Sequence, residues 1–216
     1  ACAGLLGYRF PPNFDSPYLS KDIQVFWRRW HTSLSSWLRD YLYIPLGGNR
    51  QGEMRRDVNL MTTMVLGGLW HGASFNFVIW GFLHGLALMV ERTWSTHVAS
   101  RFPKLGWGGL VIGTVITYYW VNLAWIFFRA SSLSEALQIS RTYLTFSSGG
   151  TEHLPIAVWP LMALLIGIHT LAYHSKADNF LTRLKPNTYA VAYGVLAAIA
   201  LSFVPLGYRP FIYFQF

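Results

Sequence analysis

The sequence has little cysteine and little charge. Cys2 is the single cysteine among 216 residues, which excludes an internal disulfide and a zinc site built on several thiolates. Asp, Glu, Lys and Arg make up 12% of the chain, about half the share found in an ordinary soluble domain. Nothing at the start resembles a signal peptide and no Met opens the chain, so we expect a piece of a longer protein.

Apolar and aromatic residues are abundant instead. They make up 53% and 17% of the chain, a content typical of helices that lie in and along a bilayer. The formal net charge is +8. The basic residues gather between the apolar stretches and form no patch with aromatic stacking positions, which excludes nucleic acid as a partner and favours membrane lipids.

Four stretches contain no Asp, Glu, Lys or Arg: residues 58–90, 108–128, 156–173 and 188–206. A bilayer core needs about 20 helical residues, so each of the last three fits one crossing. The first stretch has 33 residues, too many for one upright helix and slightly too few for two. Its glycines, at positions 67, 68 and 72, lie where a break would relieve this mismatch.

The distribution of Lys and Arg separates two arrangements of residues 58–90. If the stretch crosses once, the two sides of the membrane receive eleven and six basic residues; if it turns back, they receive fourteen and three. Because basic residues concentrate on one side, the sharper split favours a broken or re-entrant element, with a long tilted helix as the alternative. Irregular backbone at membrane depth needs surrounding protein or a water-filled cavity, which indicates a site.

The segment 20–56 differs from the apolar stretches because it carries seven Lys and Arg among many aromatic residues. Its apolar residues follow helical spacing from Val25 to Tyr41, which predicts a helix lying along the membrane interface until Pro45 ends it. We therefore predict one all-α domain over 1–216, a polytopic integral membrane protein. It would have about four membrane elements plus interfacial amphipathic helices.

Three histidines, His71, His84 and His169, lie inside apolar stretches. An ionisable group at membrane depth indicates function, although a buried neutral His more often makes a structural hydrogen bond between helices. Gly72 distinguishes His71, because a glycine lets a ligand or another backbone come close. His84 lies about 220° further around an ideal helix, so the two rings would not share a face.

A fourth histidine, His31, stands in FWRRWHTS. Anchoring of Trp27 and Trp30 at lipid headgroups accounts for the aromatic residues there but not for the histidine. Asp40 follows Arg39, and we interpret the two as a structural ion pair. Composition and residue spacing alone do not identify a reaction, because a transporter with a proton relay would have the same features.

Two long motifs, FWRRWHTSLSSWLRDYLYIPLGGNR and GGLWHGASFNFVIWGFLHG, resemble the membrane-bound O-acyltransferase (MBOAT) family, and within it the bacterial branch that includes alginate O-acetyltransferase. The likeness covers residues 14–91 and continues in NLAWIFFRA and the closing PFIYFQF. Residues 14–91 would be the motif-bearing catalytic region and 108–206 further transmembrane helices. Members are typically much longer, so the resemblance implies a C-terminal half that is inactive alone.

The resemblance assigns roles to single residues. The invariant membrane histidine of the family falls on His71 and a second important histidine on His31. His84 matches a secondary position, while Trp70 and Asn76 are expected to line the site or pack beside it. A neutral imidazole is a suitable general base for the attack of a hydroxyl on a thioester, and apolar burial favours the neutral form.

The resemblance also implies a substrate and partners. The donor would be acetyl-CoA or another acyl thioester, with no metal and no tightly bound cofactor. The acetyl group would cross the bacterial inner membrane through a tunnel to an extracytoplasmic acetyltransferase-like partner protein, and finally reach an exported polysaccharide. Acylation of teichoic acid, peptidoglycan, a protein or a lipid is the alternative within the family.

Overall fold

The structure, a computed structural model, describes residues 7–8, 11–101, 106–147, 156, 158–175 and 185–202. The chain forms two units, Ala1–Thr151 and Glu152–Phe216. Every regular element of the described residues is helical, which confirms the predicted all-α class. That the whole chain is one domain stays a prediction.

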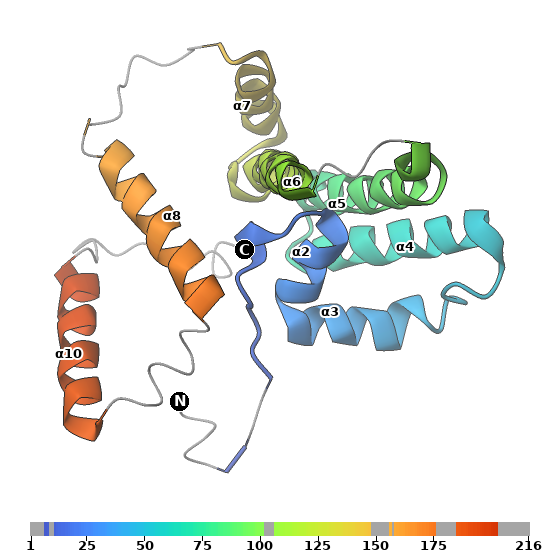
Figure 1. The fold of residues 1–216 in the computed structure, drawn as a ribbon. Helices are drawn as coiled ribbons and strands as arrows, with labels where there is room; N and C mark the ends of the chain where they lie inside the picture. Colours follow the sequence, from blue (N-terminus) through green and yellow to red (C-terminus); the bar gives the residue numbers. More distant parts are fainter. Residues whose placement is uncertain are drawn as a thin grey trace. The chain divides into compact units, whose positions relative to one another are not determined.

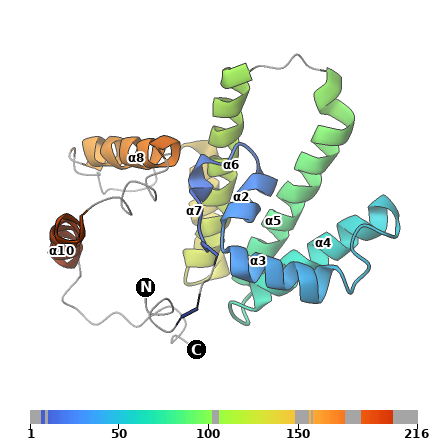
Figure 2. The ribbon, with the colours of Figure 1, turned by 60° about the horizontal axis from the view of Figure 1, so that its bottom comes forward.

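The first unit is built around one helix, α5. Its elements are η1 (Pro17–Leu19), α2 (Ile23–Arg29), α3 (Thr32–Leu38), η2 (Arg39–Tyr43), α4 (Gly52–Leu69), α5 (Phe75–Thr93), η3 (Trp94–Val98), η4 (Ala99–Arg101), α6 (Gly106–Arg129) and α7 (Leu133–Thr145). Helix α5 contacts α2, α4, α6 and α7, and lies beside α4 in Figure 1. Figure 2 shows α2 lying across this group. The buried core consists of apolar side chains from α2, α5, α6 and α7: Ile23, Phe26, Trp80, Leu88, Val121, Ala124, Phe127 and Ala136.

Glycines let α4 and α5 touch backbone to backbone. A Cβ atom added to Gly68 would lie 2.2 Å from the carbonyl oxygen of Phe77, and one added to Gly81 would lie 2.3 Å from that of Met64. Both distances are far below van der Waals contact, so only glycine fits. The contacting residues run in opposite order along the two helices, which makes α4 and α5 an antiparallel hairpin. The break and reversal predicted for residues 58–90 are confirmed.

The single helix predicted from Val25 to Tyr41 is wrong. The structure has two short helices, α2 and α3, which are interrupted at Trp30 and His31. His31 has a φ of 45°, which an α-helix cannot contain. Helical spacing of apolar residues misses such an interruption because a periodic pattern carries no information on the backbone angles of a single residue. The predicted stop at Pro45 is confirmed, since no helix continues from η2 into it.

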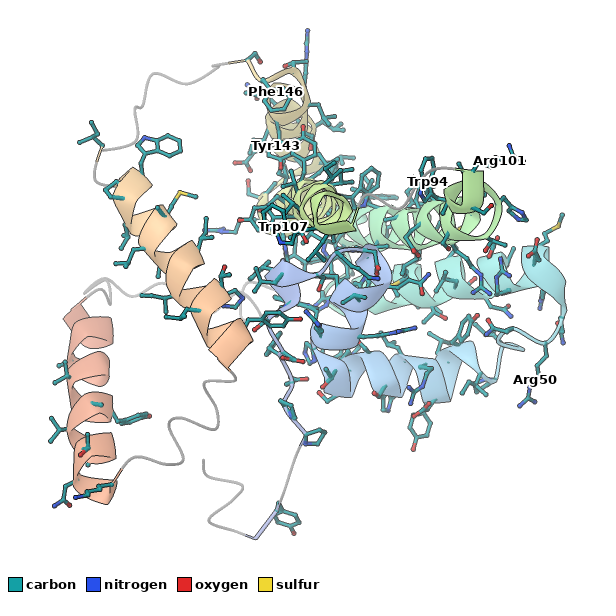
Figure 3. The ribbon with its side chains drawn as sticks, viewed as in Figure 1. Arg50, Trp94, Arg101, Trp107, Tyr143 and Phe146 are labelled. Carbon is teal, nitrogen blue, oxygen red and sulfur yellow. The ribbon has the colours of Figure 1, made fainter. Side chains whose placement is uncertain are left out.

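Helices α6 and α7 close the unit. Among the described residues, α6 is the one helix long and apolar enough to cross a membrane, with a mean hydropathy of 1.6. It coincides with the predicted stretch 108–128. Tyr119 on α6 and Tyr143 on α7 stack at 4.6 Å, and each hydroxyl donates a hydrogen bond to the other residue's carbonyl oxygen. Figure 3 shows Tyr143 and Phe146 on the α7 side of this contact.

The second unit contains α8 (Val158–Ser175) and α10 (Pro186–Ser202). These helices coincide with the predicted stretches 156–173 and 188–206, of which residues 203–206 lie outside the described residues, as does the closing PFIYFQF. His169 lies on α8. The number of membrane crossings stays a prediction.

Candidate active site

His71 lies in the turn that joins α4 to α5. Its backbone N–H donates to the carbonyl oxygen of Gly68 at 2.9 Å, and that of Gly72 donates to Leu69 at 3.1 Å, so the last turn of α4 tightens as it ends. The side chain of Ser74 caps α5 by accepting from the Asn76 N–H. The sequence therefore places His71 on five residues of irregular backbone, between two helices whose glycines hold them in contact.

Four aromatic rings surround the imidazole of His71. The ring centroids of Phe128, Trp70, Trp80 and Phe77 lie 5.0, 5.1, 5.3 and 6.1 Å away. Three of these residues come from the α4–α5 hairpin, and Phe128 comes from the end of α6. Only 9% of His71 is exposed. Such rings fix the direction in which the imidazole points, which a general base requires.

A hydrogen-bonded segment holds His31 in its left-handed conformation. The Asp15 N–H donates to the carbonyl oxygen of Arg29 on one side of His31, and the Thr32 N–H donates to that of Asn13 on the other. A left-handed backbone costs a residue other than glycine about 1–3 kcal/mol and persists where the surroundings impose it, often at functional sites. The chain stabilises this conformation with contacts on both sides.

Contacting rings connect the regions of the two histidines that the motifs name. The Nδ1 atom of His31 is buried and has no hydrogen-bond partner in the described part of the chain. Trp30, which precedes His31 in the sequence, lies 5.1 Å from Trp125. Trp125 lies 5.3 Å from Phe128, whose ring contacts His71. The structure therefore brings both predicted residues to one region.

His84 lies deeper in the core, one ring further from the turn. It is 0% exposed, and its ring centroid lies 4.8 Å from Trp80, 5.0 Å from Trp27 and 6.2 Å from Phe26. Trp80 contacts His84 on one side and His71 on the other. The predicted helical spacing of 220° does not apply, because His71 lies in the turn before α5 and only His84 lies on the helix. One tryptophan connects the two histidines.

This aromatic cluster contains buried polar atoms without partners. They are Nδ1 and Nε2 of His84 and the indole Nε1 atoms of Trp27, Trp80 and Trp125, none of which has a hydrogen-bond partner among the described residues. Each buried polar atom left unpaired costs about 1–3 kcal/mol. Five such costs would be comparable with the whole stability of a domain, about 5–15 kcal/mol. Something beyond these side chains must therefore satisfy them.

The remaining predicted residues lie around this core. Trp70 is 60% exposed while its ring contacts His71. Asn76 is buried, and its Nδ2 donates to the carbonyl oxygen of Ala130 at 3.0 Å, which is a packing role. Arg39 and Asp40 form the predicted ion pair at 2.7 Å, but it is exposed and does not face the interior. The hydrogen bond from Arg39 lowers the pKa of Asp40.

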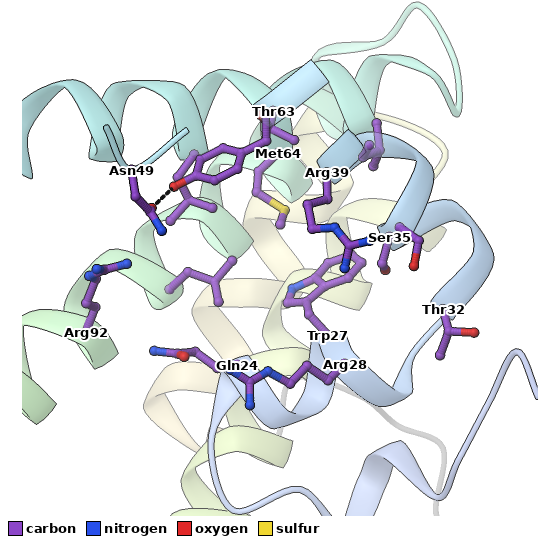
Figure 4. A pocket seen from close by; sticks show the side chains of 15 residues that line it. Gln24, Trp27, Arg28, Thr32, Ser35, Arg39, Asn49, Thr63, Met64 and Arg92 are labelled. Atoms are coloured by element: carbon purple, nitrogen blue, oxygen red, sulfur yellow. Dashed lines mark hydrogen bonds between the residues drawn. The ribbon is translucent and has the colours of Figure 1, made fainter. Parts of the chain in front are cut away.

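A pocket of about 510 Å³ opens beside this region (Figure 4). It is lined by residues of α2, α3, η2, α4 and α5 and of the turn before α4: Gln24, Trp27, Arg28, Thr32, Ser35, Ser36, Leu38, Arg39, Tyr43, Asn49, Leu60, Thr63, Met64, Leu88 and Arg92. Three arginines and no acidic residue stand among them. Arg28 and Arg92 form no ion pair with the described residues. The pocket therefore suits an anionic ligand.

Two indole rings connect the pocket with His71. Trp27 lines the pocket and lies 5.9 Å from Trp80, which lies 5.3 Å from His71. Among the described residues, no three His, Cys, Asp or Glu side chains come together as a metal site. The arrangement offers an imidazole base in an aromatic setting next to an anion-binding pocket.

Our sequence interpretation missed Trp80, Phe128 and the two pocket arginines. Trp80 stands four residues before His84, a spacing that places both on one face of a helix, so this signal was present. Phe128 closes NLAWIFF, which carries a likeness but no ionisable group. Arg28 and Arg92 are 64 positions apart, and nothing in their local sequence shows that they share a pocket.

The region that contains the site is similar in sequence to known proteins. Residues 5–134 match the family described as MBOAT, membrane-bound O-acyltransferase. The chain is 44% identical over 170 residues to the probable alginate O-acetylase AlgI of Pseudomonas aeruginosa, a match covering 78% of this chain and 31% of that protein. It is 45% identical over 150 residues to the peptidoglycan O-acetyltransferase of Helicobacter pylori, covering 68% and 27%. With the teichoic acid D-alanyltransferase of Streptococcus thermophilus it shares 36% over 101 residues, covering 44% and 24%.

The chain thus spans about a third of the length of the first two relatives. The matched residues include both histidine motifs, the α4–α5 hairpin and the pocket, and the predicted resemblance is confirmed. The chain belongs to the membrane-bound O-acyltransferase family, whose members are integral to membranes.

Proposed function

We propose that this chain carries the acyl-transfer site of a bacterial O-acetyltransferase that acts on an exported polysaccharide. The observation that carries the proposal is His71: a buried imidazole in the α4–α5 turn, ringed by aromatic side chains, inside the region matched to the family. The protein would lie in the inner membrane as a multi-pass protein and pass the acetyl group to an extracytoplasmic partner protein.

The proposed step needs one base. The unprotonated nitrogen of His71 accepts the proton of an acceptor hydroxyl while the hydroxyl oxygen attacks the thioester carbonyl carbon. The carbon–sulfur bond then breaks, and the leaving thiolate takes the proton back from the imidazolium. The products are an O-acetyl ester and a free thiol. His31, which contacting rings connect with the surroundings of His71, would orient the substrate or share the proton.

The pocket supports a thioester donor that carries phosphate groups, such as acetyl-CoA. Arg28 and Arg92 are available to bind phosphate because neither forms an ion pair with a carboxylate of the described residues. The chain of rings from Trp27 to Trp80 would then lead from the donor pocket to His71. No residue of the pocket needs to take part in bond breaking.

A second acceptor is favoured by the relatives' names. They include a peptidoglycan O-acetyltransferase and a teichoic acid D-alanyltransferase beside the alginate O-acetylases. The same chemistry at His71 serves any of these hydroxyl acceptors. Residues outside the catalytic turn would therefore determine which polymer is acylated. The match to enzymes disfavours a proton-coupled transporter, which would move its substrate without breaking a thioester.

Substitution of His71 by alanine in the whole protein tests the proposal. Acetylation of the exported polymer should be abolished while the protein still inserts into the membrane. His97→Ala is the matched control, because His97 is an exposed histidine of η3 and far from the aromatic rings of the turn in sequence. Normal acetylation by the His71 variant, measured as ester content of the polymer, would refute a catalytic role.

A further inference from the structure

The five unpartnered polar atoms of the aromatic cluster are of two chemical kinds. The indole groups of Trp27, Trp80 and Trp125 only donate hydrogen bonds. A neutral His84 donates through one nitrogen and accepts through the other. A single occupant that serves both kinds must donate and accept, as water and hydroxyl groups do. An apolar acyl chain would leave every one of these atoms unsatisfied.

The position of these atoms favours water. His84 is completely buried and Trp80 is 4% exposed, so the occupant must be small and enclosed by rings. The rings of Trp27, Trp80 and His84 contact one another at centroid distances of 4.8 to 5.9 Å, so their buried unpartnered nitrogens belong to one group of contacting rings. Buried waters typically have two to four polar partners, a number that the four unpartnered nitrogens of these three residues can provide.

We infer that the cluster between α2, α5 and α6 binds internal water, and that His84 is a positioning residue that acts on His71 through Trp80. Water bound by His84 anchors the indole N–H of Trp80. The Trp80 ring packs edge-on against His71, at 5.3 Å and an interplanar angle of 86°. The hydrated cluster therefore sets the direction of the His71 imidazole. The effect on His71 rests on the proposed function, whereas the water site does not.

His84→Phe in the whole protein separates this role from simple packing. Phenylalanine keeps an aromatic ring but removes both nitrogens. If His84 only packs, the variant loses two unpaired buried atoms, so its melting temperature and kcat should stay the same or rise. If His84 binds water, the variant should melt at a lower temperature and lose about tenfold in kcat with an unchanged KM for the donor. His84→Gln, which still donates and accepts, should recover most of the loss.

A second variant keeps the test decisive if His84→Phe does not fold. Trp80→Phe removes one indole N–H and keeps a ring against His71. Its melting temperature should fall, because the water loses a partner; a rise would overturn the inference. Where both single variants fold, their combined effect on melting temperature should be smaller than the sum, since both act on one water. Additive effects would overturn a shared water.

The proposed water can be observed directly, without an activity assay. A high-resolution cryo-electron microscopy map of the whole protein, without donor or acceptor, should show a density peak for water within hydrogen-bond distance of His84 and Trp80. A protein side chain or an empty space there would overturn the inference. Failure of the proposed function would appear instead as normal acyl transfer by His71→Ala, which leaves the map and the melting temperatures interpretable.

Discussion

Gly81→Ala should separate the two helices that carry His71. A Cβ atom at this position would lie 2.3 Å from the carbonyl oxygen of Met64 and 2.9 Å from the Cα atom of Val65, both of them backbone atoms of α4. Ordinary contact begins near 3.4 Å, so α4 must move away by about 1 Å. Overpacking of this kind costs about 1–3 kcal/mol, and a backbone obstacle belongs at the upper end of that range.

Replacing a glycine inside a helix also gives a gain of about 1 kcal/mol, because alanine has the higher helix propensity. The expected net loss for Gly81→Ala is therefore about 2 kcal/mol, with a corresponding fall in melting temperature. The rate of acyl transfer should fall even at temperatures where the variant is fully folded, because the turn between the helices holds the His71 ring. Thermal unfolding in detergent, followed by tryptophan fluorescence, and an acyl-transfer assay measure the two effects.

Gly85→Ala is the matched control, on the same helix and the same interface. Its Cβ atom would lie 2.8 Å from the Met61 sulfur, near the end of a flexible side chain that can turn aside. The clash is therefore relieved by a rotamer change, and the propensity gain leaves stability almost unchanged. Equal melting temperatures for Gly81→Ala and Gly85→Ala would refute the backbone contact between α4 and α5.

Four further substitutions test a helix cap, an exposed carboxylate and the pocket. Ser132→Ala removes the side chain that accepts from the Glu135 N–H at the start of α7 and should cost about 1 kcal/mol in thermal unfolding. Hydrogen bonds from Ser131 lower the pKa of Glu135 from its ordinary 4.5, so this carboxylate contributes stability above that pH and loses it as pH falls through the folded value. Glu135→Gln should therefore weaken the loss of thermal stability between neutral and acid pH; an unchanged pH profile would count against the contact. Arg28→Gln and Arg92→Gln should raise KM for a phosphate-bearing donor and leave kcat nearly unchanged, and an unchanged KM would remove the donor from this pocket.

Much of the helical framework follows from local sequence. Long runs without charge predict helices, and the structure has α6, α8 and α10 where three of the runs lie. The glycines at 67, 68 and 72 predicted a break in the remaining run, 58–90, but only Gly72 lies in it. Gly67 and Gly68 lie in the last turn of α4, where Gly68 allows the close approach of α5. The interruption at His31 could not be predicted in this way. Its left-handed backbone is held by hydrogen bonds that Thr32 donates to Asn13 and Asp15 donates to Arg29, which no helical period reveals.

The sequence by itself determined that the protein is helical, that it is rich in membrane-type segments, and that His71 and His31 stand in family motifs. These are local properties, carried by composition, spacing and short runs of residues. Only the tertiary structure decided that Trp80 joins His71 to His84, that Phe128 completes the rings around His71, and that Arg28 and Arg92 share a pocket. Such groups depend on which faces of distant helices meet, and that is set by the close approach of α4 and α5 and the packing of α2 and α6 on α5.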